Sequence, residues 1–189
     1  PPAVTFLNPL SGATGVSTNV TVTVRLDDNT GVISNGILVR VNGVTSYTNG
    51  AFSTGYNGAG SIVVRTNLGY RVAVDRTSPY GDGQAVILSV TARDAAGNTR
   101  ATNWTFTTAD MTAPIVTLVG PTPAATGVAT NASIVVRWDD NFGGAVSNSI
   151  VVRISNGGTN RRVFTNGAFL VGYGGAITRT NLGFRVTVN

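Results

Sequence analysis

The sequence predicts an all-β protein built as two tandem β-sandwiches, and three observations carry that prediction. The 189-residue chain contains no Lys and no Glu, whereas Val, Thr, Gly and Asn are abundant. Lys and Glu favour helices, Val and Thr favour strands, and Gly and Asn favour tight turns. In addition, apolar and polar residues alternate along several segments, and most of the chain occurs twice.

The alternating segments indicate the strands and the faces that they bury. Residues 19–26 (NVTVTVRL), 84–94 (QAVILSVTARD) and 103–108 (NWTFTT) each alternate with a period of two, which is typical of a strand with one face on a core. The residues predicted to point inward are Val20, Val22, Val24, Leu26, Val86, Leu88, Val90, Ala92, Trp104 and Phe106. In the second copy of residues 19–26 they are Ala132, Ile134, Val136 and Trp138. Turn signals separate the segments, as expected for roughly seven strands in a sandwich of about 110 residues.

The repetition consists of four blocks in the same order. Residues 2–29 match 114–141, and 15 of these 28 pairs are identical. The other matching pairs are 34–41 with 147–154, 48–56 with 165–173, and 65–74 (RTNLGYRVAV) with 179–188 (RTNLGFRVTV). We interpret the recurrence of RTNLGYRVAV as a repeated building unit, because the ring of Tyr70 is kept in Phe184 while the hydroxyl is lost.

The blocks define the expected domains, which are a first repeat at 1–109, a short linker at 110–113 and a second repeat at 114–189. The linker is too short for free tumbling, so the two repeats should form a semi-rigid rod. The first repeat continues past its last block through two further strands, which the second repeat lacks. Because such a sandwich exposes apolar faces and strand edges, we expect a continuation of the chain or a neighbouring chain to complete it.

Three short patterns resemble bacterial Ig-like repeats. They are P-x-V-T-x-x-x-P-x-x-G-A-T-G-V at Pro2–Val16, A-R-D-A-A-G-N-T…W-T-F-T-T-A-D at Ala92–Asp110, and D-x-T-A-P at Asp110–Pro114. Such repeats are similar to fibronectin type III and cadherin-like sandwiches. They occur in tandem in large bacterial adhesins, surface proteins and phage fibre or decoration proteins. The resemblance therefore implies two Ig-like domains in an extracellular, cell-surface or virion protein.

The composition argues against catalysis, nucleic-acid binding and membrane insertion. Without His, Cys, Lys or Glu the chain cannot form a Ser-His-Asp triad, a Cys-His pair, a Ser-Lys dyad or a His-rich zinc site. The net charge of +5 arises from scattered Arg residues, whereas nucleic-acid binding normally needs clustered basic residues with interleaved aromatics. No stretch is long and apolar enough to span a bilayer. We therefore expect no enzyme activity and no catalytic residue.

Oxygen atoms of several loop residues could coordinate calcium, although turn formation explains the same residues. Hard cations bind several oxygen ligands, and Asp and Asn also cap tight turns. The candidate residues are Asp27, Asp28, Asn29, Asp94, Asn98 and Asp110. In cadherin-like relatives acids near the domain joints bind calcium, and Asp110 lies in such a joint.

Aromatic residues near the loops offer a second candidate site, which would bind cell-surface glycans by stacking. They are Tyr47, Phe52, Tyr56, Tyr80, Phe169 and Tyr173. The recurrence of A-F-x-x-G-Y in both repeats is also explained by rings that pack over a Gly-rich turn.

Three functions remain after these exclusions. The first is a structural and adhesive module, in which the repeats act as a spacer or display rod. The second is a carbohydrate-binding module that acts through its loop aromatics. The third is a self-assembling filament or fibre subunit, completed by strands from a neighbouring subunit. The repetition, the short linker and the lack of catalytic side chains favour the first.

Overall fold

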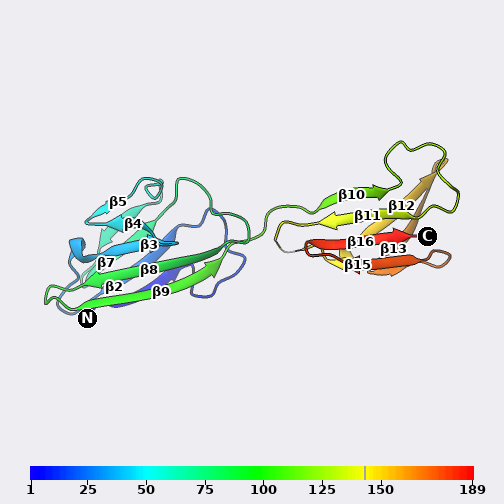
Figure 1. The fold of residues 1–189 in the computed structure, drawn as a ribbon. Coiled ribbons are helices and arrows are strands. Elements are labelled where there is room, and N and C mark those ends of the chain that lie inside the picture. Colours follow the sequence, from blue (N-terminus) through cyan, green and yellow to red (C-terminus); the bar gives the residue numbers. More distant parts are fainter. Residues whose placement is uncertain (143) are drawn as a thin grey trace. The chain divides into compact units, whose positions relative to one another are not determined.

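The computed structural model describes residues 1–142 and 144–189, and it consists of strands joined by turns and two short 3₁₀-helices (Figure 1). The chain separates into two compact units, Pro1–Asp110 (unit 1) and Met111–Asn189 (unit 2). The described part of the chain contains no α-helix, and so no helix there could cross a membrane. The predicted all-β class is confirmed.

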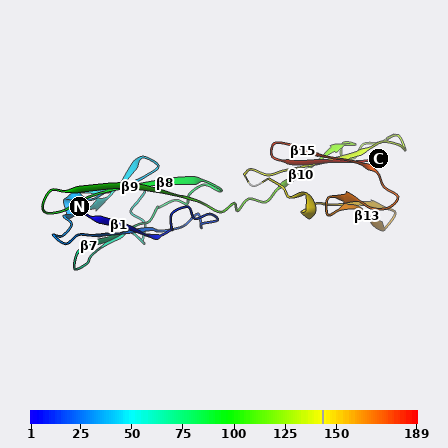
Figure 2. The ribbon, with the colours of Figure 1, turned by 90° about the horizontal axis from the view of Figure 1, so that it is seen from below.

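Unit 1 is a sandwich of two antiparallel sheets, seen as separate layers in Figure 2. One sheet has four strands in the order β1-β2-β7-β6, and the other has five in the order β5-β4-β3-β8-β9. The strands of the first sheet are β1 (Ala3–Asn8), β2 (Val22–Asp27), β6 (Ile62–Arg65) and β7 (Gly69–Val74). Those of the second are β3 (Leu38–Val41), β4 (Val44–Thr48), β5 (Ala51–Phe52), β8 (Ala85–Arg93) and β9 (Thr99–Thr107). A 3₁₀-helix, η1 (Ser34–Gly36), precedes β3.

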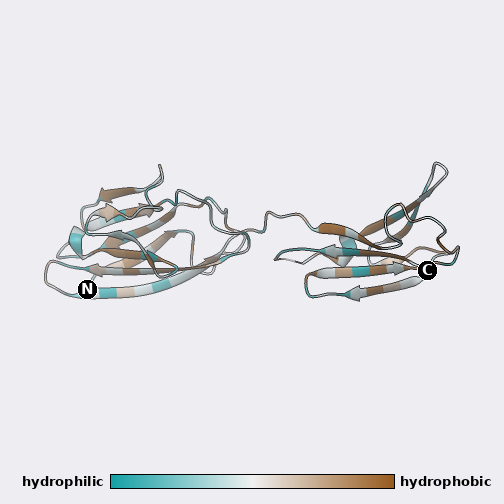
Figure 3. Cartoon of the chain, turned by 45° about the horizontal axis from the view of Figure 1, so that its top comes forward, coloured by the Kyte–Doolittle hydropathy of each residue, from teal (hydrophilic) through white to brown (hydrophobic). Residues whose placement is uncertain are grey.

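The core of unit 1 lies between its two sheets and follows the predicted alternation. Many residues of the strands are hydrophobic, coloured brown in Figure 3. The predicted inward residues of β2, β8 and β9 are all buried, namely Val22, Val24, Leu26, Val86, Leu88, Val90, Ala92, Trp104 and Phe106. The ring of Trp104 stacks on Phe6 of β1 with centroids 3.7 Å apart, which joins the two sheets through an aromatic contact.

Unit 2 repeats the four-stranded sheet of unit 1, in the order β10-β11-β16-β15. Its strands are β10 (Ile115–Gly120), β11 (Ile134–Asp139), β15 (Gly175–Arg179) and β16 (Gly183–Val188). The opposing sheet has three strands, β12 (Val151–Asn156), β13 (Thr159–Thr165) and β14 (Ala168–Phe169), after the 3₁₀-helix η2 (Ser147–Ser149). Within residues 111–142 and 144–189, β8 and β9 have no counterpart, as the repeat alignment predicts.

The smaller second sheet leaves the core of unit 2 less covered. Val22, Val24 and Leu26 of β2 are buried, whereas their counterparts Ile134, Val136 and Trp138 are only partly buried. One inward residue was predicted wrongly, because Ala132 is exposed and precedes the start of β11 at Ile134. The alternation in the sequence therefore extended two residues beyond the paired strand.

Candidate functional site

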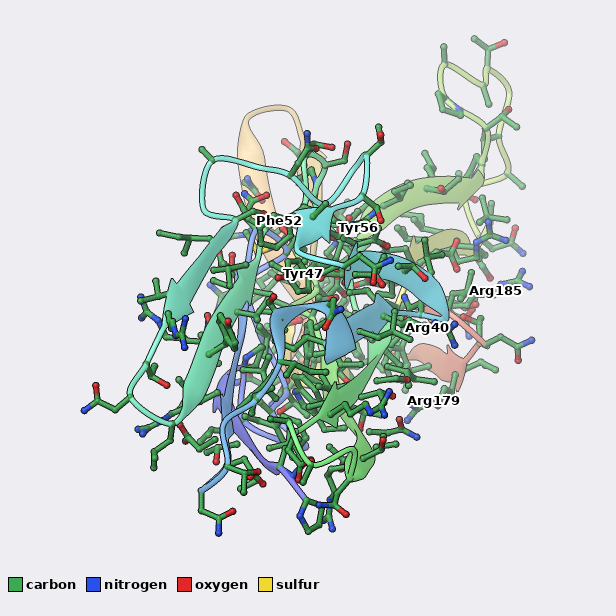
Figure 4. The ribbon with its side chains drawn as sticks, turned by 90° about the vertical axis from the view of Figure 1, so that its left-hand side faces the viewer. Arg40, Tyr47, Phe52, Tyr56, Arg179 and Arg185 are labelled. Carbon is green, nitrogen blue, oxygen red and sulfur yellow. The ribbon has the colours of Figure 1, made fainter. Side chains whose placement is uncertain are left out.

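Tyr47 and Phe52, two of the candidate sugar-binding rings, pack together inside unit 1. Tyr47 lies on β4 and Phe52 on the adjacent β5, with ring centroids 5.0 Å apart (Figure 4). Only 1% of Tyr47 is exposed, and this burial raises the pKa of its hydroxyl. A sugar stacks on a ring whose face is free, and Tyr47 has no such face in this structure.

Tyr56 and Tyr80 are also buried, and they flank an arginine that the sequence did not single out. The guanidinium carbon of Arg76 lies 4.6 Å from the ring centroid of Tyr80 and 5.8 Å from that of Tyr56, within cation–π range. Tyr80 also meets Phe106 edge-to-face at 5.7 Å. Burial raises the pKa of Tyr80 to about 12, so this phenol stays neutral at physiological pH. These contacts hold the segment that follows β7 against the core of unit 1.

The aromatic contacts of unit 2 repeat those of unit 1. Phe169 meets Phe164 at 5.0 Å, as Phe52 meets Tyr47, and Tyr173 packs against the core of unit 2. Phe164 was missed from the sequence, although its place before the repeated TNGAF block could have identified it. Since the hydroxyl of Tyr47 is lost in Phe164 while the ring contact is kept, the shared task of these rings is packing.

The structure brings together three of the six candidate calcium ligands, which are the two carboxylates of Asp28 and Asp94 and the side chain of Asn98 beside Asp94. Both carboxylates are buried, and the amino nitrogen of Pro1 lies 3.8 Å and 3.9 Å from them. The hydroxyl and the N–H of Thr30 donate to Asp28 at 2.6 Å and 2.8 Å. The side-chain amide and the N–H of Asn98 donate to Asp94, both at 2.8 Å. These donors satisfy the carboxylate oxygens as tight turns do.

The other candidate ligands lie elsewhere. Asp27 points to the outer face of its sheet, where its carboxylate pairs with Nε of Arg25 at 2.6 Å. Asn29 is exposed in the turn after β2, and Asp110 ends unit 1, after β9. The described residues contain no group of three or more acidic side chains placed to hold a metal ion. The carboxylates of Asp28 and Asp94 accept local hydrogen bonds of the kind that Asp makes in tight turns.

Because the carboxylates of Asp28 and Asp94 are buried and hydrogen-bonded, we expect unit 1 to lose stability in acid. Hydrogen bonds from Thr30 lower the pKa of Asp28, and hydrogen bonds from Asn98 lower the pKa of Asp94. A carboxyl with a lowered folded pKa stabilises the fold above its unfolded pKa of about 4, and this contribution disappears as the pH falls through the folded pKa. The melting temperature of the chain should therefore fall between about pH 5 and about pH 2.

The variants Thr30→Val and Asn98→Ala test this source of the acid sensitivity. Each removes the side-chain donor to one carboxylate and keeps the backbone N–H donor, so the melting temperature should be lower at neutral pH and should fall less steeply in acid. Calorimetry across the pH range measures both effects. An unchanged pH profile in both variants would assign the acid sensitivity to other groups.

A family model and a solved structure match this chain. The family model for the bacterial Ig-like domain matches residues 1–108. A solved structure described as "Anomalous substructure of Titin-A168169" has a TM-score of 0.39 and 13% sequence identity, covering 98% of this chain and 82% of that chain. The search of curated proteins gives no match.

The family match and the fold lead to one assignment. The matched residues are those of unit 1, with its four-stranded and five-stranded sheets and its continuous core. Unit 2 repeats the four-stranded sheet from a repeated sequence. The bacterial Ig-like domain is a non-catalytic domain type, and this chain belongs to that family.

Proposed function

We propose that the chain is a semi-rigid spacer and display segment of a large surface protein, outside a bacterial cell or on a virion such as a phage fibre. One observation carries the proposal: a repeated sequence folds into two units that share the same four-stranded sheet. A spacer needs modules that fold by themselves and follow each other through short joints. Each unit has a core of its own, and unit 2 begins at Met111, directly after unit 1 ends at Asp110.

The side chains of unit 1 support a passive role for its interior. The candidate rings Tyr47, Tyr56 and Tyr80 are used in packing, and the carboxylates of Asp28 and Asp94 accept local hydrogen bonds. Function in such a module resides in spacing and in the outer surface. We propose that adhesion or display depends on these two properties.

The proposal predicts a narrow distribution of distances between the two units. Because the chain contains no cysteine, Thr99→Cys and Thr130→Cys introduce two unique, exposed sites for spin labels, one in each unit. Pulsed electron paramagnetic resonance should give one narrow distance distribution for the natural joint.

The matched control is the same labelled chain with ten Gly and Ser residues inserted after Met111. This flexible insert should broaden the distribution, because Gly/Ser segments behave as random coils. A natural joint that gives a distribution as broad as the insertion variant would contradict the spacer proposal.

A further inference from the structure

The outer face of each four-stranded sheet carries two arginines directly opposite each other. In unit 1, Arg25 of β2 pairs in register with Arg71 of β7. In unit 2, Arg137 of β11 pairs in the same way with Arg185 of β16. All four side chains are exposed, and Figure 4 shows Arg185 at the periphery of unit 2.

This arrangement is unfavourable for the isolated fold. Like charges directly opposite each other on neighbouring strands destabilise a sheet. Asp27 compensates Arg25 at 2.6 Å, and Asp139 compensates Arg137 at 2.5 Å. Among the described residues, however, Arg71 and Arg185 form no ion pair with an acid. Each sheet therefore presents one guanidinium held by a carboxylate and a second one available to an external anion.

A groove lies beside each arginine pair; both arginines line it in unit 1, and Arg137 lines it in unit 2, opposite Arg185 in the strand register. In unit 1 the groove has a volume of about 780 Å³ and is lined by Leu7, Arg25, Val64, Thr66, Asn67, Leu68 and Arg71. In unit 2 a smaller groove of about 230 Å³ is lined by Arg137, Asp139, Thr180, Asn181 and Leu182. The leucines in the two grooves are similarly exposed, at 49% for Leu68 and 51% for Leu182. Core packing explains neither these leucines nor the arginines.

The repeats differ at some exposed positions and agree at others, including this row. Asn8, Leu10 and Ser11 are exposed, and the second repeat has Gly120, Thr122 and Pro123 in their places. Buried residues have changed as well, since Leu26 corresponds to Trp138. The outer row Thr5, Arg25 and Arg71 is nevertheless identical to Thr117, Arg137 and Arg185.

We propose that these two grooves bind the carboxylate groups of an acidic polysaccharide. A guanidinium presents a planar fork of N–H donors that matches a carboxylate, and one available guanidinium on each of the two repeated sheets favours a ligand with repeated anionic groups. The exposed asparagines of the RTNL segment, Asn67 and Asn181, supply partners for sugar hydroxyls. Leu7, Val64 and Leu68 supply an apolar wall for the C–H face of the sugar rings.

The position and the lining of the grooves favour an acidic polysaccharide over an acidic peptide or a nucleic acid. β2 and β7 are central strands that pair on both sides, so their backbone groups are engaged in the sheet. Extended peptides bind sheets by pairing with a free strand edge, which the groove between β2 and β7 does not offer. Single-stranded nucleic acids stack on aromatic rings, and the residues that line the two grooves include no ring. A hydroxyl-rich acidic chain fits this lining best.

The experiment uses the full 189-residue chain and polygalacturonate as the probe. Calorimetric titration should show binding that weakens with added salt and disappears with the fully methyl-esterified polymer, which keeps the sugar backbone but has no charge. The double variant Arg71→Gln/Arg185→Gln should lower the affinity by about tenfold or more. Polyglutamate should bind more weakly than polygalacturonate at equal charge.

The matched control is the double variant Arg93→Gln/Arg100→Gln, which removes the same charge from exposed positions on β8 and β9. It should bind polygalacturonate like the natural chain. Removing Arg71 and Arg185 should also leave the melting temperature unchanged or higher, whereas a structural role for these arginines requires it to fall. The proposal is overturned if the natural chain does not bind polygalacturonate, if both double variants lose affinity equally, or if polyglutamate binds more tightly.

Discussion

Replacing Leu88 by Ala should lower the free energy of unfolding of unit 1 by about 2–5 kcal/mol. Leu88 is fully buried on β8, faces Trp104 across the β8–β9 pair and belongs to the core between the two sheets. Truncation to Ala removes apolar contacts and leaves a cavity, because the surrounding sheets can collapse only partly. Urea unfolding followed by Trp104 fluorescence, in a Trp138→Phe background, reports on unit 1 alone.

The adjacent residue supplies the control for this experiment. Ile87 is on the same strand but 52% exposed, so Ile87→Ala should change the free energy of unfolding by less than about 0.5 kcal/mol. The two variants delete similar aliphatic groups from neighbouring positions, and only the face of the sheet differs. Equal losses in both would mean that β8 does not separate a buried face from an exposed one.

The strands could be predicted from the sequence because buried and exposed residues alternate along them. Each strand of unit 1 has one covered face, so the inward residues of β2, β8 and β9 follow directly from the period of two. The repeat alignment likewise predicted which strands unit 2 lacks. The prediction failed for Ala132 because alternation does not show where the pairing of β11 with its neighbours begins.

The candidate sites were harder to predict, because sequence does not show which residues meet across strands. Tyr47 and Tyr80 are candidates for sugar binding from their proximity to turns, yet both are buried, Tyr47 against Phe52 of β5 and Tyr80 against Phe106 of β9. Arg76 was missed because its partners Tyr56 and Tyr80 come together only in the folded unit. The Arg25–Arg71 pair also depends on register, since the two residues are distant in the sequence.

In the repeated RTNLG segment, some residues are explained by the predicted turn and others only by the folded structure. Its backbone forms the same turn in the two units, with Asp28 N–H bonded to Leu68 O at 2.9 Å and Asp140 N–H bonded to Leu182 O at 2.8 Å. The recurrence of the glycine and the ring is thus explained by architecture, as the sequence indicated. Architecture does not explain the exposed Arg71 and Leu68, or their counterparts Arg185 and Leu182. The proposed polysaccharide groove explains them.

Replacing Gly69 by Ala should destabilise unit 1 by about 1–3 kcal/mol, because the strand β7 approaches β2 too closely for a side chain. A Cβ at this position would lie 2.1 Å from the carbonyl oxygen of Leu26, a backbone atom that cannot move without disturbing the β2–β7 pairing. The same contact recurs in unit 2, where a Cβ on Gly183 would lie 2.0 Å from the carbonyl oxygen of Trp138. Urea unfolding followed by Trp104 fluorescence, in the Trp138→Phe background, measures the loss.

Gly81→Ala is the matched control, since a Cβ there would meet its nearest neighbour, Oε1 of Gln84, at an ordinary 3.5 Å. This variant should be neutral or slightly stabilising, because Ala reduces the conformational freedom of the unfolded chain. A loss confined to Gly69→Ala would show that the glycine of RTNLG is required by the spacing of β2 and β7. If both variants are equally stable, the close approach of β7 to β2 does not require a glycine at this position.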